Sequence, residues 1–318
     1  MTCPKCQHEK PKRFGTYGKA KTQRYRCRDC GATFTEPTQK PLGRHYTSVD
    51  AASKAVALLC EGMSIRAVSR LTGLHKNTLL RLLLTIGAKC ERLLDQRIVG
   101  LKSRNVQADE LWTTVGKRLR KDGRKRVLTN PTHGDQYVWF ALDSDTKLII
   151  SQYVGKRNTP SAEAFIDDLS QRVPERLQLT TDGFDSYADA VSTFMPFADY
   201  AQLVKLYQKG RGSGPDWYGP ANYVRNIPTP LRGDPDLKKI STSFVERLNL
   251  TARMHCRRLT RLTNAYSKSL RHLKAAIALL VAWYNFVRVH QTLRVTPAMQ
   301  AGLTDHVWSI NELLATQI

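Results

Sequence analysis

The sequence is short of acidic residues. Its 318 residues include 27 Asp and Glu against 50 Lys and Arg, which leaves a formal net charge of +23 at pH 7. A surplus of this size is typical of chains that bind nucleic acid, because each phosphate that a basic side chain neutralises releases condensed counterions. We therefore expect a nucleic-acid partner.

Long hydrophobic runs are also missing. The longest apolar stretch, residues 275–287, is interrupted by Asn285 and is too short to span a bilayer. The first residues, MTCPKCQHEK, lack the apolar core of a secretory signal. We therefore expect no membrane partner and a cytoplasmic protein, associated with the nucleoid if its partner is DNA.

Cysteine is scarce, but four of the seven cysteines are regularly spaced. They form two Cys-x-x-Cys pairs, and the ligand set that these pairs predict is Cys3, Cys6, Cys27 and Cys30. Four thiolates at this spacing can reach one tetrahedral Zn²⁺, with Gly31 providing the turn that aims backbone amides at the sulfurs. Two disulfides would use the same residues, but the absence of an export signal argues against an oxidising compartment.

The sequence thus predicts a zinc ribbon at residues 1–45 with a structural Zn²⁺. Residues 1–48 carry eleven basic and three acidic side chains, so we expect the ribbon to touch DNA. The other cysteines stand in apolar or helical surroundings that favour packing over metal binding; they are Cys60, Cys90 and Cys256.

Residues 46–104 have the pattern of a helix-turn-helix domain. A helix is predicted at 49–60, and two more at 62–87 around Gly73, with Ser64 and His75 opening them. A further helix is expected between Gly87 and residue 105. The second helix of such a motif enters the major groove with its first residues, here His75, Lys76, Asn77 and Arg81. An ordinary helical hairpin is the alternative.

From residue 105 onward, strands alternate with helices. The expected order is three strands, a helix, a strand, a helix and a strand, followed by a late helix that begins near Ser243. This order predicts a mixed α/β layer. A segment rich in Gly, Pro and charge interrupts it at 207–242, and loops of this length are functional or disordered.

Three carboxylates of this region are candidates for a metal centre. Asp109 lies within a strand, Asp182 at the carboxyl end of another, and Glu246 in the first turn of the late helix. Carboxylates of this kind can hold two Mg²⁺ ions for phosphodiester chemistry. Each also has a simpler interpretation, as a strand-end acid, a turn residue or a surface ion-pair partner. Four other acids compete with them: Glu110, Asp143, Asp145 and Asp185.

Several segments together resemble one family, the insertion-sequence-1 family of bacterial and archaeal DDE transposases. They are VQADELWTTVGKR, YVWFALDSDTKLIISQYVGKR, LTTDGFDSY, FVERLNLTARMHCRRLTRLT and the late run SKSLRHLKAAIALLVAWYNFVRVHQTL with its following TPA. The resemblance covers most of the chain, including the cysteine pairs and the helix-turn-helix pattern. The longer spacing between the second Asp and the Glu, at 207–242, is the main departure.

The resemblance implies a multidomain α/β protein. Residues 105–318 would form an RNase H-like catalytic domain with a C-terminal helix, an insertion at 207–242 and a triad of Asp109, Asp182 and Glu246. The implied cofactors are Mg²⁺ or Mn²⁺ beside the structural Zn²⁺. The implied partners are double-stranded DNA, as terminal inverted repeats and target, and further copies of the chain in a dimer or higher oligomer.

The resemblance also implies a basic residue two helical turns after the glutamate, where Arg253 stands. Residues 246, 250, 253, 257 and 260 would share one face of a continuous helix, so that Arg253 and Arg257 grip the DNA strand being cut.

The sequence also bears on three other functions. A domesticated, catalytically inactive DNA-binding regulator would need no acidic triad, yet all three acids are present. A plain nuclease of similar fold differs only in lacking strand transfer. A tyrosine recombinase is excluded, because His290 and Arg294 have the wrong spacing and the last tyrosine is Tyr284.

Overall fold

The computed structural model describes residues 2–18, 21–35, 41–43, 45–116, 130–208 and 222–316. The chain divides into two compact units, residues 1–44 and 45–318. Within the described ranges, no helix combines the length and the apolar character needed to cross a bilayer.

The first unit is a small antiparallel sheet. Its strands are β1 (Lys12–Tyr17), β2 (Thr22–Arg26) and β3 (Thr33–Thr35), with β2 in the centre. Beside them, the backbone N–H of Cys27 donates to the carbonyl of Ala32 at 2.9 Å, and Gly31 takes a φ of +70°. This is the tight turn that the sequence assigned to Gly31, since a positive φ favours glycine.

The second unit begins with three helices, α1 (Val49–Cys60), α2 (Ile65–Thr72) and α3 (Lys76–Arg97). The Ser64 hydroxyl accepts from the N–H of Ala67 and caps the start of α2. Gly73, with φ +72°, is the C-cap that follows its last residue. His75 caps α3 through Nδ1, which accepts from the N–H of Asn77 at 3.3 Å. The helix boundaries predicted around the turn are therefore confirmed.

The expected helix break at Gly87 is wrong. Helix α3 continues through Gly87 to Arg97, and α7 (Leu270–Ala282) packs across it. A Cβ atom at Gly87 would lie 2.5 Å from both Cα and Cβ of Ala275. Glycine is present here because two helices approach closely, and not because a helix ends.

The core of the second unit is a mixed six-stranded sheet in the order β6-β5-β4-β7-β8-β9. Strand β4 pairs antiparallel with β5 and parallel with β7, and the other pairs are antiparallel except β7 with β8. This is an RNase H-like arrangement with one added edge strand. The strands are β4 (Asn105–Val115), β5 (Gly134–Asp143), β6 (Ile149–Gly155), β7 (Gln178–Thr181), β8 (Asp199–Gln208) and β9 (Asn222–Arg232).

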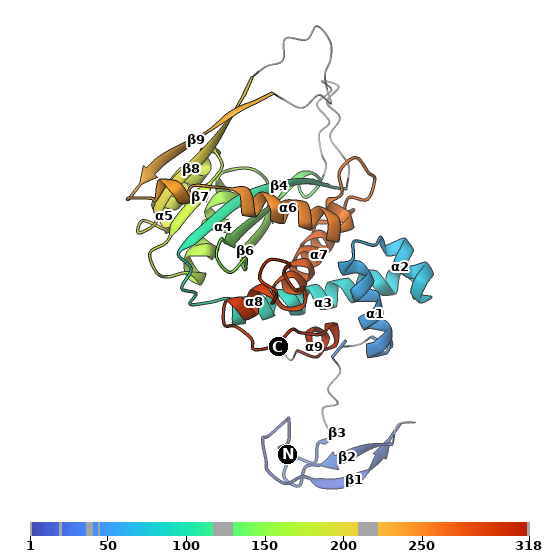
Figure 1. The fold of residues 1–318 in the computed structure, drawn as a ribbon. Coiled ribbons are helices and arrows are strands. Elements are labelled where there is room, and N and C mark those ends of the chain that lie inside the picture. Colours follow the sequence, from blue (N-terminus) through green and yellow to red (C-terminus); the bar gives the residue numbers. More distant parts are fainter. Residues whose placement is uncertain are drawn as a thin grey trace. The chain divides into compact units, whose positions relative to one another are not determined.

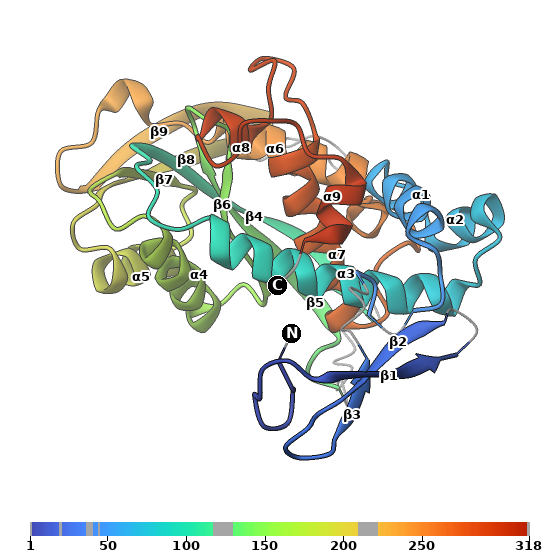
Figure 2. The same ribbon diagram turned by 90° about the horizontal axis from the view of Figure 1, so that it is seen from below.

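Helices cover both faces of the sheet (Figures 1 and 2). On one face lie α4 (Thr159–Arg172) and α5 (Ser186–Phe194), and α6 (Ser243–His255) crosses β4 on the other. The rings of Trp139, Phe165 and Tyr187 meet beneath α4 and α5, with centroids 5.5–6.5 Å apart. This buried cluster fixes α5 against β5.

Helix α7 leads into a π-helical turn, Trp283–Val287, and then into α8 (Pro297–Gln300) and α9 (Ile310–Ala315). The polar residue in this apolar run has a structural role. Asn285 is fully buried, and its amide group donates to the carbonyl of Ile149 and accepts from its N–H, at 2.9 and 3.0 Å. Both backbone groups at the start of β6 are thereby satisfied.

Segment 207–242 is more regular than its composition suggested. It contains β9 and a short 3-10 turn, Leu237–Lys239, while residues 209–221 lie outside the described part. Strand β9 is an edge strand, and Pro228 and Pro230 lie within it opposite Leu203 and Ala201. An edge position tolerates proline because one side of the strand needs no donors.

The continuous helix expected from residue 246 to 260 is also wrong. Helix α6 ends at His255, Cys256 is extended, and a 3-10 turn follows at Arg257–Leu259. The end of α6 is held against the α1–α2 connection, where the His255 ring lies 3.0 Å from the carbonyl of Cys60. Arg257 and Thr260 therefore do not share the helical face of Glu246.

Candidate active site

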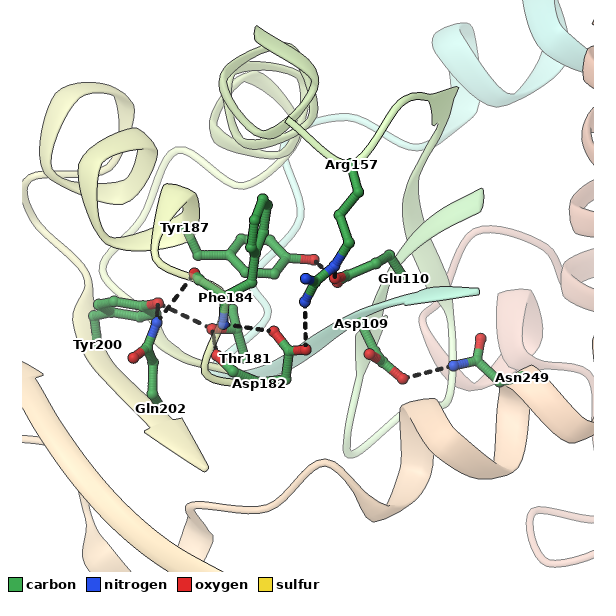
Figure 3. A network of polar contacts seen from close by, with 10 residues as sticks. All are labelled: Asp109, Glu110, Arg157, Thr181, Asp182, Phe184, Tyr187, Tyr200, Gln202 and Asn249. Carbon is green, nitrogen blue, oxygen red and sulfur yellow. Dashed lines mark hydrogen bonds and ion pairs between the residues drawn. The ribbon is translucent and has the colours of Figure 1, made fainter. Parts of the chain in front are cut away.

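Three carboxylates converge on the sheet. One oxygen each of Asp109, Glu110 and Asp182 lie within 4.8 Å of one another (Figure 3). Asp109 and Glu110 lie in the middle of β4, whereas Asp182 directly follows β7. Because β7 runs parallel to β4 and stops at Thr181, its carboxyl end brings Asp182 beside the longer strand.

The two β4 acids face different helices, as consecutive strand residues must. Asp109 faces α6, where Asn249 donates from Nδ2 to Asp109 Oδ2 at 2.7 Å. Glu110 faces α5, where the Tyr187 hydroxyl donates to Oε2 at 3.0 Å. Each carboxylate is thus held by a side chain from a different layer of the fold.

The cluster carries more negative charge than its surroundings neutralise. Burial, followed by the charges of Glu110 and Asp182, raises the pKa of Asp109 to about 7. Burial and the Asp182 charge also raise the pKa of Glu110. Crowded carboxylate oxygens of this kind suit a hard divalent cation such as Mg²⁺ or Mn²⁺, so the donor set fits the metal that the resemblance implies.

Arg157 supplies positive charge to the site. It follows β6, and its guanidinium pairs with Glu110 through Nε and with Asp182 through Nη2, the latter at 3.2 Å. The guanidinium carbon also lies 4.1 Å from the ring centroid of Phe184. Arg157 therefore joins β4 to the loop after β7 (Figure 3).

The loop that carries Asp182 is fixed from both sides. The Asp182 carboxylate accepts from the N–H of Phe184 at 3.1 Å. On the sheet side, Thr181 and the Tyr200 hydroxyl lie 2.9 Å apart, and Gln202 donates to the same hydroxyl at 3.0 Å. These polar contacts restrain the turn that carries Asp182 (Figure 3).

Glu246 lies near the cluster but is not one of its three members. Its Oε1 accepts from the Thr242 hydroxyl and pairs with Lys205 of β8. After burial and the charges of Glu110 and Asp182, the Glu246 charge also contributes to the raised pKa of Asp109. The structure thus brings Asp109 and Asp182 together and leaves Glu246 in an ion pair beside them.

Gln107 fixes the start of α6. Its Oε1 accepts from the N–H groups of Phe244 and Val245, at 2.9 and 3.2 Å, so two amides of the first turn of α6 bond to β4. Since Gln107 and Asp109 are two residues apart on one strand, they face the same helix.

The two arginines assigned to the cut strand differ in setting. Arg253 is half-buried, burial lowers its pKa, and its Nε has no hydrogen-bond partner within the described ranges. Arg257 is exposed and lies beyond the end of α6. Only Arg253 shares the helix of Glu246.

The remaining competing acids lie outside the cluster. Asp143 accepts from the Ser103 hydroxyl at 2.8 Å and from the N–H of Asp145 in the β5–β6 turn. Asp145 accepts from Asn105, and Asp185 precedes α5. Of the four competing acids, Glu110 alone joins the cluster.

Sequence reasoning missed Gln107, Arg157 and Asn249. A signal existed for two of them: Gln107 precedes Asp109 by two residues on a strand, and Asn249 follows Glu246 by three on a helix. Arg157 gave no such signal, since its partners are far away in the sequence.

The residues assigned to a DNA-reading helix lie at the start of α3. His75, Lys76, Asn77 and Arg81 are all exposed, and Lys76 is the first residue of the helix. The geometry leaves these side chains accessible to a ligand.

The four N-terminal thiols form a second cluster, with one Sγ each of Cys3, Cys6, Cys27 and Cys30 within 4.8 Å of one another. The Sγ atoms of Cys3 and Cys30 are 3.6 Å apart, and those of Cys6 and Cys27 are 3.4 Å apart. The backbone N–H of Cys30 lowers the pKa of Cys27, which favours the thiolate form. Four such donors fit a tetrahedral zinc ion, as in a zinc ribbon.

One family model matches the chain. It describes a DDE domain, of the IS240 transposase type, and it matches residues 132–211. This range contains Asp182 but neither Asp109 nor Glu246. No curated protein sequence matches the chain.

Solved structures of transposases are similar to the chain. The Mos1 transposase paired-end complex with the left transposon end has 15% identity over 49% of this chain, with a TM-score of 0.21. This chain spans 59% of the length of that Mos1 chain. The piggyBac transposase synaptic complex with hairpin DNA has 13% identity over 84% of this chain and 69% of its own, with a TM-score of 0.36.

Proposed function

We propose that this chain is the DNA transposase of an insertion sequence of the insertion-sequence-1 family. It would bind terminal inverted repeats, cut DNA with a divalent metal and join the freed 3′ ends to target DNA. The observation that carries this proposal is the meeting of Asp109, on β4, with Asp182, directly after the neighbouring parallel strand β7, in an RNase H-like sheet. The match of residues 132–211 to a DDE domain supports it.

Asp109, Asp182 and Glu246 would hold Mg²⁺ or Mn²⁺, and Glu110 adds a fourth carboxylate at the cluster. When bound, such ions activate the attacking oxygen and stabilise the leaving oxygen of a phosphodiester. The protein's own contribution is placement. Asn249 orients Asp109, and Arg157 restrains Glu110 and Asp182.

DNA binding would use the exposed start of α3 and the arginines near α6. In this proposal Asn77 and Arg81 reach base edges while His75 and Lys76 contact the backbone or bases beside them. Arg253 and Arg257 would hold the strand at the active site. The zinc ribbon would add basic surface, and pairing of two DNA ends would require a homo-oligomer. Such a protein would act in the cytoplasm, on the nucleoid.

The test is a strand-transfer assay. Purified protein is incubated with duplexes carrying the terminal repeats that flank its own reading frame, Mg²⁺ and a target plasmid. The proposal requires plasmid molecules joined to the 3′ ends of the repeats. Cleavage without joining would identify a nuclease instead, and binding without cleavage would identify an inactive regulator.

A further inference from the structure

A cavity of about 860 Å³ lies outside the carboxylate site, between helices α1–α3 and the segment that follows α6. Its size falls in the range of pockets that enclose a small organic ligand. Part of its lining is apolar, from α3 and α7: Leu80, Leu83, Ala276, Leu279 and Leu280. The sequence assigned DNA contacts to two of the lining residues, Lys76 and Arg257, but no function to the cavity itself.

The charged part of the lining is cationic. Among the described residues that line the cavity, none is Asp or Glu, and the charged ones are Arg66, Lys76, Arg257, Arg258 and Lys268. Apolar walls beside these positive charges are complementary to an anion with an apolar body.

Arg258 has the most costly setting of these cations. Its Nη1 donates to the Ser267 hydroxyl at 3.1 Å, whereas its buried Nη2 has no partner in the part of the chain that the structure describes. Burial lowers the pKa of Arg258. A desolvated charge without a counter-ion is expensive, and an anion bound in the cavity would offset that cost.

The cavity also offers an aromatic ring, that of Tyr266, with Lys268 Nζ 3.5 Å from its centroid. Aromatic rings beside cations are the usual surroundings of nucleobases in single-stranded nucleic-acid sites. Tyr266 can thus pack against a base while the cations hold the phosphate.

The cavity and the carboxylate site lie near opposite ends of the same helix, α6. Glu246 lies in the first turn of α6, and His255, which lines the cavity, is the last residue of the helix. Nine residues of helix span about 14 Å, the length of about four base pairs of duplex. DNA that reaches the carboxylates would therefore pass the cavity within a few nucleotides.

We propose that this cavity takes a nucleotide unit that has left the stack of the bound DNA. Its base would lie on the apolar wall beside Tyr266, and its phosphate would contact Arg66 and Arg258. This inference rests on the proposed function for its partner, DNA, but it adds an unpaired nucleotide as the ligand of a second site.

The experiment uses the full chain without Mg²⁺, so that no cleavage occurs, and compares two duplexes of one sequence. One is fully paired, and the other contains a single bulged 2-aminopurine. Because the bulged base has no pairing partner, moving it out of the stack costs less free energy. Affinity is measured by anisotropy, and insertion by 2-aminopurine fluorescence. We expect about tenfold tighter binding of the bulged duplex, the scale of one stacked base, with quenching of the bulged base.

Matched variants locate the effect. Arg66→Gln removes a cavity cation, whereas Arg70→Gln removes one from the next turn of α2, outside the cavity. Arg258→Gln and the exposed Arg261→Gln form a second pair. Only the first member of each pair should reduce the preference for the bulge to less than about twofold. Thermal unfolding of each variant shows whether it is folded, and the Arg66 pair suffices if Arg258→Gln is not.

Each remaining outcome is decisive. Equal affinity for both duplexes, or equal loss in both members of the Arg66 pair, overturns the inference while strand transfer still supports the proposed function. Competition by free deoxyadenosine monophosphate without quenching of the bulged base would assign the cavity to a small nucleotide instead. Failure to bind any duplex would overturn the proposed function as well.

Discussion

Asn249 of α6 donates a 2.7 Å hydrogen bond to Asp109 of β4, and so connects the helix that carries Glu246 to the strand that carries the buried acid. Asn249 is itself buried, and its Oδ1 has no hydrogen-bond partner within the described ranges. The contact therefore fixes one carboxylate and one helix at once, which makes Asn249 a positioning residue for the proposed reaction.

Replacing this amide should lower activity without lowering DNA affinity. Asn249→Leu keeps a buried side chain of similar length but removes the donor to Asp109. Loss of a residue that orients a metal ligand costs about 10- to 100-fold in activity, which is the decrease we expect in strand transfer. The exposed neighbour Leu250→Ala is the control and should stay within about twofold. Equal activity of the two variants would show that Asp109 needs no orientation.

Removing the charge of Glu246 should separate cutting from binding. Glu246→Gln keeps the size of the side chain but loses a carboxylate that would hold the cation, so Mg²⁺-dependent cleavage should fall by at least about 100-fold. Gel-shift titrations with terminal-repeat DNA should show no weakening, since a negative charge has been removed from a basic surface. Glu163→Gln, on the exposed face of α4, is the charge-matched control. Normal cleavage by Glu246→Gln would remove this residue from the triad.

The raised pKa of Asp109 predicts how stability depends on pH. In the Mg²⁺-free protein, the folded state holds a proton on Asp109 up to about pH 7, whereas the unfolded chain releases it near pH 3.8. The folded state binds more protons between these values, so the Asp109 contribution to stability is present below about pH 4 and is lost as pH rises toward 7.

Asp109→Asn should therefore raise the Tm of the Mg²⁺-free protein at pH 7–8, by an amount equivalent to several kcal/mol at most, about 1.4 per pKa unit. The gain should shrink toward pH 4, where the native carboxyl is also neutral. Thermal melts across this range measure it, with the exposed Asp189→Asn as control. A gain in Tm that does not change with pH would contradict the assignment.

The thiol cluster predicts about one zinc per chain by metal analysis of purified protein. Cys27→Ser removes one of the four donors, so zinc should be lost and DNA binding weakened. Cys90→Ala deletes a buried thiol of α3, outside the cluster, and should leave the zinc content unchanged. Full zinc content in Cys27→Ser would show that this residue is not a ligand.

The crossing of α3 and α7 depends on the absence of a side chain at Gly87. Gly87→Ala should destabilise the second unit by about 1–3 kcal/mol, since its methyl group would overlap Ala275. Ala275→Gly in the same chain should recover part of this loss, because the two positions share one space. Urea unfolding of the two single variants and the double variant tests the coupling. Strict additivity would show that the helices can separate at no cost.

Local patterns in the sequence predicted most individual helices and strands. They did not predict features that depend on contacts with distant parts of the chain. Ser64, Gly73 and His75 act through neighbouring amides, so their caps could be read directly. Gly87 has the same residue type as a helix stop, and only the approach of Ala275 shows its actual reason. Likewise, β9 was not predicted because it contains two prolines, which are tolerated in an edge strand.

The same limit applies to the site. Asp109 stood out because an acid within a strand is costly to bury, and Asp182 because it follows the carboxyl end of a strand, where sites of α/β sheets gather. The structure brings the two together. Arg157 belongs to the same network, yet it is 47 residues from Glu110 and 25 from Asp182. No periodicity links such positions, since the contact is created by the pairing of β6 with β5, of β5 with β4 and of β4 with β7.

The prolines of β9 have a consequence for assembly. Pro228 and Pro230 are two residues apart, so both of their missing N–H groups belong to the same side of the strand, the side turned away from β8. A second chain that tried to extend the sheet there would meet two successive positions without a donor. If copies of this chain assemble, the edge at β9 therefore lacks the continuous row of donors that joining two sheets there would need.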